Sequence, residues 1–229
     1  MAKKLYEESN IQAIADAIRS KNGTTDTYKV SEMAGAIGAI EAGVADPRVK
    51  EIIERTITEI SDDSITKLGD YAFSYCQQLK TVTFPNVIVL GNNVFYSCKA
   101  LQQVVCPRIA NIGRYAFYNC ANLSVVDFPQ TTTIDGNAFN SCSKVTKAVF
   151  PLVTSIGFQA FVNNRLLTTL IIGTTDCVLV DINAFSNTPI KKGTGFIYVP
   201  DGAVEAYKTA TNWSTYADQI KGISELPQE

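Results

Sequence analysis

Residues 68–85 read LGDYAFSYCQQLKTVTFP, and variants of this stretch return along the chain every 22 residues. Phenylalanine marks the repeat at a constant offset, at Phe73, Phe95, Phe117, Phe139 and Phe161. A column of cysteines follows in the same phase, at Cys76, Cys98, Cys120 and Cys142. A fixed period of roughly 20–50 residues is the signature of a repeat protein whose units stack on one another.

The second half of each repeat has the alternation of a β-strand. Leu79, Val82 and Phe84 are expected to point inward, and Thr81 and Thr83 to point outward. One coil cannot bury its own apolar face, so successive coils must stack as a parallel ladder with strands about 4.8 Å apart. The proline after each strand donates no hydrogen bond, which ends the ladder there. The sequence therefore predicts a solenoid of 22-residue coils.

The motif that begins at Leu68 is LG-x-x-AF-x-x-C-x-x-L-x-x-V-x-FP, and four more copies follow with small changes. It resembles the BspA-like class of leucine-rich repeats of bacterial surface proteins over about residues 56–220. The resemblance implies a β-rich α/β fold, a right-handed leucine-rich-repeat solenoid used to bind other macromolecules. Relatives of this type are associated with adhesion to host matrix proteins such as fibronectin. No binding motif of the family carries over residue by residue.

We expect two parts in the chain. Residues 1–43 form a short N-terminal helical hairpin, which serves as an attachment segment, and residues 44–229 form the solenoid. The solenoid divides into an N-terminal cap (46–64), the repeats (65–200) and a helical C-terminal cap (201–222). In that last cap Trp213, Tyr216, Ala217 and Ile220 recur at helical spacing, and Trp213 is expected to plug the last coil.

The N-terminal hairpin is too short to fold stably alone, so it must pack on its own solenoid, a second copy or a partner. Self-association through residues 5–41 is one expectation. Residues 14–34 are also similar to a segment of tail-associated proteins of phages and prophages of Gram-positive bacteria.

Composition excludes several function classes. The 229 residues carry 20 Lys and Arg against 22 Asp and Glu, with no long basic run, which argues against nucleic acid as a partner. The chain has no His, which removes Ser-His and Cys-His catalytic pairs and His-ligated zinc. No window approaches the roughly 18 apolar residues of a membrane span, so we expect no membrane insertion.

The first ten residues lack the apolar stretch of a secretory signal. We therefore expect the chain to be associated with a virion, or to reach a cell surface by another route or after trimming; otherwise it is cytoplasmic.

Cysteine spacing favours packed thiols. The gaps contain no C-x-x-C pair, and a stack would place Cys76, Cys98, Cys120 and Cys142 in one buried column with side chains held parallel. A disulfide and a metal site are the weaker readings of the same column. We predict no metal site and no cofactor.

Two surfaces are candidates for binding a protein or a cell-surface glycan. The outward strand positions become more apolar toward the last coils, which is typical of a contact site. These positions are Val149, Ile171, Phe196 and Tyr198. Tyrosines also gather in the AF-x-x-C segments of the first three coils, where an apolar ring with a polar tip suits either partner. They are Tyr71, Tyr75, Tyr96, Tyr115 and Tyr118.

Together these features favour a non-enzymatic binding protein, because repeats supply broad surface and no convergent catalytic group is visible. The leading hypothesis is a phage or prophage tail accessory that attaches to a cell surface. A secreted BspA-like adhesin for host matrix proteins is the alternative, and a structural spacer without a ligand is a third. A glycosidase would need paired carboxylates, yet Asp127 is the only acidic residue at the outward strand positions of the five regular coils.

Overall fold

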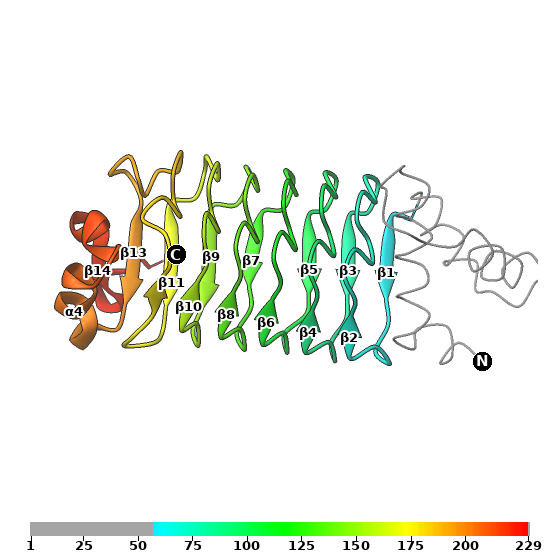
Figure 1. Cartoon of the computed structure of the whole chain (residues 1–229), viewed down its shortest axis with the longest axis horizontal. Coiled ribbons are helices and arrows are strands. Elements are labelled where there is room, and N and C mark those ends of the chain that lie inside the picture. The colour runs from blue at the N-terminus through cyan, green and yellow to red at the C-terminus, as the bar shows by residue number, and fades with distance from the viewer. Residues whose placement is uncertain (1–56, 229) are drawn as a thin grey trace, which may run out of the picture.

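The computed structural model describes residues 57–228, which form one stack of coils closed by helices at its C-terminal end (Figure 1). The predicted fold class, a solenoid with a parallel strand ladder, is confirmed. The predicted hairpin within residues 1–43 and the first part of the N-terminal cap, up to residue 56, lie outside the described residues.

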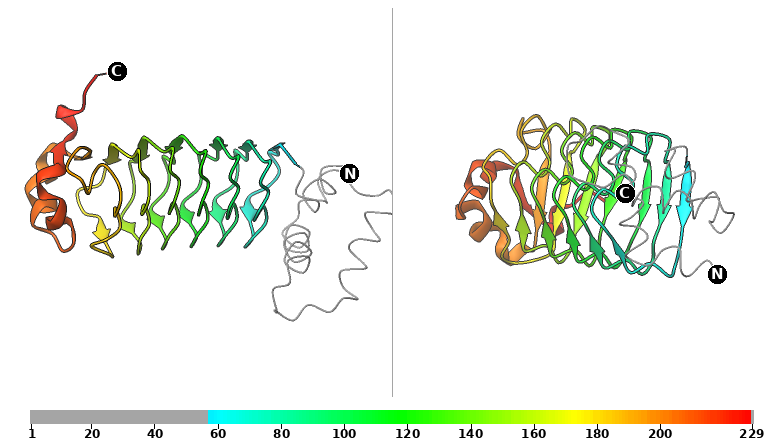
Figure 2. Two further views of the ribbon diagram at one scale, coloured as in Figure 1. Left: turned by 90° about the horizontal axis from the view of Figure 1, so that it is seen from above. Right: turned by 45° about the vertical axis from the view of Figure 1, so that its right-hand side comes forward.

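Each coil contributes one strand to each of two rows, which run along two sides of the stack (Figure 2). The first row contains the L-x-x-V-x-F strands: β1 (Glu59–Ser61), β3 (Thr81–Thr83), β5 (Gln103–Val105), β7 (Val125–Asp127), β9 (Lys147–Phe150), β11 (Thr169–Ile172) and β13 (Phe196–Val199). The second row contains shorter strands: β2 (Lys67–Leu68), β4 (Val89–Leu90), β6 (Asn111–Ile112), β8 (Thr133–Ile134), β10 (Ser155–Ile156) and β12 (Val178–Leu179). All the pairings between coils are parallel, with Thr81 opposite Gln103 and Val125 opposite Lys147.

The two rows differ in continuity. The second row is a single six-stranded sheet. The first row divides into a three-stranded sheet, β1-β3-β5, and a five-stranded sheet that starts at β7. The coils that carry β5 and β7 therefore separate on one side of the stack while they remain paired on the other.

The third side of each coil is the AF-x-x-C turn segment, which also bonds from coil to coil. The N–H of Tyr75 donates to the carbonyl of Tyr96 at 2.7 Å, and the N–H of Ser97 donates to the carbonyl of Tyr118 at 2.7 Å. These bonds satisfy the backbone of a segment that is neither helix nor strand.

The core is a column of stacked phenylalanine rings. Neighbouring rings from Phe73 to Phe185 have centroids 5.1–5.6 Å apart and planes within 16° of parallel. All of these rings are buried. Such offset stacks contribute about 0.5–1.5 kcal/mol per pair beyond the burial of their area, so the column that marks the repeat in the sequence also holds the coils together.

The cysteine column lies beside the rings, and the prediction of packed thiols is confirmed. All six cysteines are buried thiols. The Sγ atoms of Cys98, Cys120 and Cys142 donate to the carbonyls of Phe73, Phe95 and Phe117 at 3.0–3.1 Å. Burial raises the pKa of the Cys142 thiol to about 12, so these side chains behave as small hydrophobic groups with a weak donor.

The C-terminal cap covers the last coil, as predicted for Trp213. Its indole Nε1 donates to the carbonyl of Cys177 at 2.6 Å, and its ring lies 6.2 Å from Phe185. The Tyr216 hydroxyl donates to the carbonyl of Ile182 at 2.6 Å. The lone tryptophan therefore closes the open end of the stack, which every solenoid must protect.

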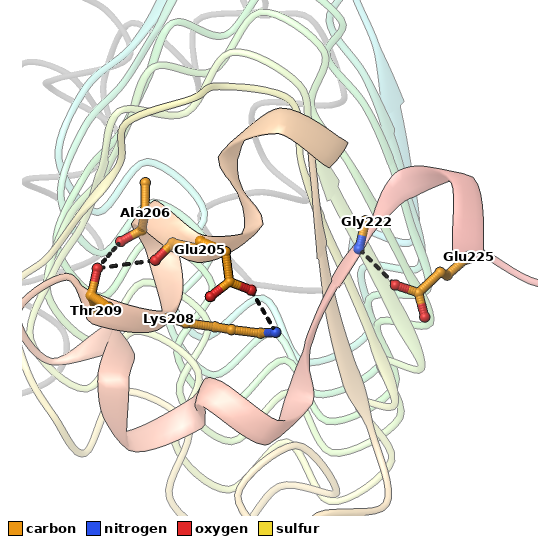
Figure 3. A network of polar contacts seen from close by, with 6 residues as sticks. All are labelled: Glu205, Ala206, Lys208, Thr209, Gly222 and Glu225. Atoms are coloured by element: carbon orange, nitrogen blue, oxygen red, sulfur yellow. Dashed lines mark hydrogen bonds and ion pairs between the residues drawn. The ribbon is translucent and has the colours of Figure 1, made fainter.

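The cap itself is built from η3 (Asp201–Ala203), α4 (Val204–Thr209), η4 (Trp213–Gln219) and η5 (Ile223–Glu225). Figure 3 shows how α4 is tied, with the Thr209 hydroxyl donating to the carbonyls of Glu205 and Ala206 at 3.0 and 3.2 Å. The helical spacing predicted for Ile220 is wrong. Ile220 begins β14 (Ile220–Gly222), which pairs in parallel with β13 and extends the first row by one strand.

One position in the cysteine column holds a buried amide side chain in place of a thiol. Asn164 occupies the cysteine position in the fifth coil; its side chain is fully buried, and neither its Nδ2 nor its Oδ1 has a hydrogen-bond partner among the described residues. A buried polar group without a partner costs about 1–3 kcal/mol.

We expect Asn164→Cys to raise the free energy of unfolding by about 1–3 kcal/mol, because a thiol there can donate to the Phe139 carbonyl as its counterparts do. Urea unfolding at neutral pH under reducing conditions measures the change. Thr188→Cys is the matched control in the same column, since the Thr188 hydroxyl already donates to the Phe185 carbonyl at 2.6 Å. An Asn164→Cys protein no more stable than the parent would contradict the prediction.

Candidate binding surfaces

On the turn side of the first three coils, the rings of four predicted tyrosines lie together: Tyr75, Tyr96, Tyr115 and Tyr118. The rings of Tyr96 and Tyr118 stack with centroids 4.8 Å apart and planes 10° from parallel. Tyr75 lies 5.3 Å from Tyr96, and Tyr115 lies 5.6 Å from Tyr118. Tyr71 precedes Tyr75 on the same turn segment and is half-buried. We call these five residues the tyrosine edge.

The backbone of the tyrosine edge adopts an unfavourable conformation. Tyr71, Tyr75 and Tyr115 have φ angles of 63°, 62° and 57°, in the left-handed region that bulky side chains rarely enter. Other coils place asparagine at most of the equivalent sites, as at Asn93, Asn119, Asn137 and Asn163, and serine or glutamine at the rest, as at Ser97, Ser141 and Gln159. Asparagine tolerates this region because its short polar side chain can bond locally, so tyrosine is the costlier choice for folding.

The chemistry of the tyrosine edge is aromatic and polar, with one cation. The Arg114 guanidinium lies 5.3 Å from the centroid of the Tyr115 ring. Burial, together with the neighbouring hydroxyls of Tyr75, Tyr118 and Tyr115, raises the pKa of Tyr96. The Tyr96 hydroxyl thus remains a neutral donor and acceptor at physiological pH. This set can pack on an apolar or sugar surface and bond its polar rim.

The second candidate surface, on the first row of strands, differs from the prediction at its C-terminal end. Tyr198 is only 4% exposed and is not an open binding residue, because the chain's own C-terminal segment packs on this end of β13. The Lys221 ammonium lies 4.2 Å from the centroid of the Phe196 ring, which is half-buried. Val149 and Ile171 are half-buried as well. The apolar trend toward the last coils therefore serves, at β13, to pack the tail.

The most exposed apolar side chains of this row lie in the middle of the stack instead. Val125 is 64% exposed and Val105 is 39% exposed, where the row divides between β5 and β7. Both valines stood at outward positions in the sequence, yet periodicity alone did not distinguish them. The one available signal was Cys106, which replaces the phenylalanine that follows the neighbouring strands at Phe84 and Phe128.

A groove of about 530 Å³ opens at this division. It is lined by residues from β5 and β7 and the segments that flank them, together with Thr81 of β3. Its residues are Thr81, Gln102, Gln103, Val104, Val105, Cys106, Pro107, Ser124, Val125, Asp127 and Pro129. We call it the β5–β7 slot.

Within residues 57–228, no group of three or more metal-ligating side chains comes together. In the same range, no helix is long and apolar enough to cross a membrane.

Comparison with known proteins identifies the family of the repeats. The family model described as the BspA type leucine rich repeat region matches residues 54–168, in six copies. No curated protein matches the chain significantly.

Three solved structures share the fold. A leucine-rich repeat protein from Bacteroides ovatus is 21% identical with a TM-score of 0.54, covering 66% of this chain and 41% of its own. A leucine rich cell surface protein from Faecalibacterium prausnitzii is 24% identical with a TM-score of 0.54, covering 74% of this chain and 48% of its own. The pneumococcal vaccine antigen PcpA is 14% identical with a TM-score of 0.54, covering 72% of this chain and 40% of its own. This chain thus spans less than half the length of each.

The family match extends over half of the chain, and the structure carries the strand, phenylalanine and cysteine columns in the register of that repeat. The protein belongs to the BspA-type leucine-rich repeat family.

Proposed function

We propose that the protein is a non-enzymatic binding protein that attaches to a cell surface through its tyrosine edge. The observation that carries the proposal is that Tyr71, Tyr75 and Tyr115 occupy left-handed backbone positions which recur from coil to coil and which the other coils give to asparagine, serine or glutamine. Strained residues of this kind cost about 1–3 kcal/mol each and concentrate at functional sites. Tyrosine is also among the residues enriched at the energetic centres of protein interfaces.

Two settings suit such an attachment protein. The first is a bacterial surface protein that adheres to host matrix proteins such as fibronectin, which is supported by the family and by the cell surface relative from Faecalibacterium prausnitzii. The second is a phage or prophage tail accessory, which is supported by the sequence resemblance of residues 14–34. The settings differ in target, because an adhesin binds host matrix protein and a tail accessory binds bacterial cells.

The double variant Tyr75→Asn/Tyr115→Asn tests the tyrosine edge. It replaces two strained tyrosines by the residue that other coils use at equivalent sites. We expect the affinity for the target to fall at least about tenfold, since interface tyrosines commonly contribute more than about 1.4 kcal/mol. The free energy of unfolding should not fall, and relief of backbone strain should raise it by about 1 kcal/mol per site.

Binding of labelled full-length protein to Gram-positive cells and to immobilised fibronectin, side by side, is the measurement. Phe158→Asn is the matched control, because Phe158 is an aromatic residue, 50% exposed, outside the tyrosine edge. Unchanged binding in the double variant would refute the tyrosine edge as the site. Loss of binding together with loss of stability would show that the tyrosines serve the fold instead.

A further inference from the structure

The β5–β7 slot interrupts a sheet that is otherwise paired from coil to coil. On the N-terminal side of the slot, the N–H of Gln102 donates to the carbonyl of Lys80 at 2.8 Å, and the N–H of Phe84 donates to the carbonyl of Val105 at 2.9 Å. The corresponding bonds across the slot, from Ser124 to Gln102 and from Cys106 to Asp127, are not formed among the described residues. Two strand edges therefore face each other without pairing.

Only one side of the stack is open at this point. The same two coils are bonded in the second row, where Asn111 stands opposite Thr133, and on the turn side, where Phe95 donates to Ala116 at 2.7 Å. The coils are thus held at two sides and separated at the third. The slot is a fixed feature of the stack rather than a loose end of it.

A local reason for the opening is the residue that follows β5. The phenylalanines that follow the neighbouring strands pack on the core column, with Phe84 lying 5.9 Å from Phe73 and Phe128 lying 5.7 Å from Phe117. Cys106 replaces this ring with a small side chain, so Phe128 has no ring to stack on in the coil before it. Val104, the inward residue of β5, is half-buried, whereas its counterparts Val82 and Val126 are buried.

The lining of the slot combines unpaired backbone groups with apolar side chains, which is unusual for a gap filled only by water. Unpaired backbone N–H and C=O groups call for hydrogen-bonding partners, yet Val104, Val105 and Val125 present apolar surface beside them. The volume is within the roughly 300–1,000 Å³ range of clefts that bind ligands. An extended peptide offers both requirements at once, since its backbone can pair with a strand edge while alternate side chains cover the valines.

The charge of the slot lining indicates which kind of side chain the bound peptide carries. Asp127 is the only Asp, Glu, Lys or Arg that lines the slot, and it takes part in no ion pair among residues 57–228. An exposed carboxylate next to apolar side chains complements a lysine or arginine on the bound peptide.

We propose that the β5–β7 slot binds an extended peptide segment of a partner protein, which pairs through its backbone with the exposed strand edges and places a basic side chain on Asp127. The inference rests on the proposed binding function, but it uses a different surface from the tyrosine edge. The slot would bind a short linear segment, whereas the tyrosine edge would contact a broader surface.

Selection from a phage-displayed library of random heptapeptides on the full-length protein tests the slot. We expect enriched peptides to carry a lysine or arginine among β-branched residues. Synthetic copies should lose about tenfold in affinity when one backbone amide is N-methylated, the equivalent of one hydrogen bond. On binding, amide hydrogen exchange should slow at residues 103–106 and 125–127.

Two substitutions locate the binding. Val125→Arg should weaken the peptides at least about tenfold by charge repulsion and bulk, and Asp127→Asn should weaken them up to about fivefold, mostly at low salt. Val89→Arg is the matched control, because Val89 is an exposed valine of the second row, 38% exposed.

Three results would overturn the proposal: no peptide enriched above background, peptides that bind Val125→Arg as tightly as the parent, or N-methylated peptides that bind unchanged. Concentration-dependent self-association abolished by Val125→Arg would also overturn it, assigning the slot to a second copy of this chain. Loss of cell or fibronectin binding in the Tyr75→Asn/Tyr115→Asn protein, with peptide binding intact, separates the tyrosine edge from the slot.

Discussion

Phe139→Ala is expected to lower the free energy of unfolding by about 3–5 kcal/mol, the cost of removing a buried aromatic ring and leaving its cavity. Phe139 stands in the middle of the ring column. Its centroid lies 5.1 Å from Phe117 and 5.3 Å from Phe161, and it also contacts Phe128 and Phe150. The neighbouring coils hold these rings in place through backbone pairing, so the cavity cannot collapse fully.

In a stack where each coil contacts only its nearest neighbours, losing this ring also makes the coils on its two sides unfold less cooperatively. Equilibrium urea unfolding followed by circular dichroism measures both effects. Phe158→Ala is the matched control, since the same substitution at a ring that is 50% exposed should change stability by less than about 0.5 kcal/mol. A small loss at Phe139, comparable to the control, would mean that the ring column does not hold the coils together.

Raising the pH above 9 is expected to unfold the protein under reducing conditions. Burial raises the pKa of Cys106, Cys142 and Cys177 from the ordinary 9.0 to about 12. The folded state therefore keeps these thiols protonated at a pH where the unfolded chain has already released their protons. The stability that they contribute is fully present below pH 9 and is lost as the pH rises toward 12.

The expected size of this effect is large. Each such thiol lowers the free energy of unfolding by about 1.4 kcal/mol per pH unit in that window. Three of them together therefore remove about 4 kcal/mol per unit, against a total stability of about 5–15 kcal/mol for a typical domain. Tyr207 and Tyr216, whose pKa values burial raises to about 12, act in the same direction above pH 10.

Chemical unfolding at a series of pH values from 7 to 10.5 measures the slope. In Cys142→Ser the hydroxyl can still donate to the Phe117 carbonyl, but the titrating thiol is gone, so the slope should fall by about 1.4 kcal/mol per pH unit. A stability that stays constant from pH 8.5 to 10.5 would show that the thiols are not protected from ionisation.

The architecture could be predicted from the sequence because it follows from a short-range periodicity. Phe73, Phe95 and Phe117 stand one coil apart, and a constant offset can be satisfied only by stacking equivalent residues on one another. The cysteine column followed from the same reasoning, whereas the role of Trp213 followed from helical spacing in the C-terminal cap. Each residue in these columns has the same neighbours in every coil, so local pattern and tertiary packing agree.

The binding surfaces were only partly accessible. The tyrosines were recognised as a cluster, but only the structure shows that Tyr75 and Tyr115 have a left-handed backbone, at sites that other coils give mostly to asparagine. Tyr198 was expected to be open, yet residues more than twenty positions later pack on its strand. A sequence pattern places a side chain on a face, but it does not show which distant segment covers that face.

The amino-acid sequence by itself determined the coil, its period, its inward columns and the family, because all of these depend on residues within one or two repeats. Only the tertiary structure decided that β14 completes the sheet, that the tail covers β13 and that the ladder opens between β5 and β7. The first two depend on contacts with a segment more than twenty residues later, and the opening depends on how one exceptional residue, Cys106, changes the packing of the coils on either side. A periodic pattern describes what the coils have in common, so it does not show how one exceptional coil packs. The three-dimensional structure does show it.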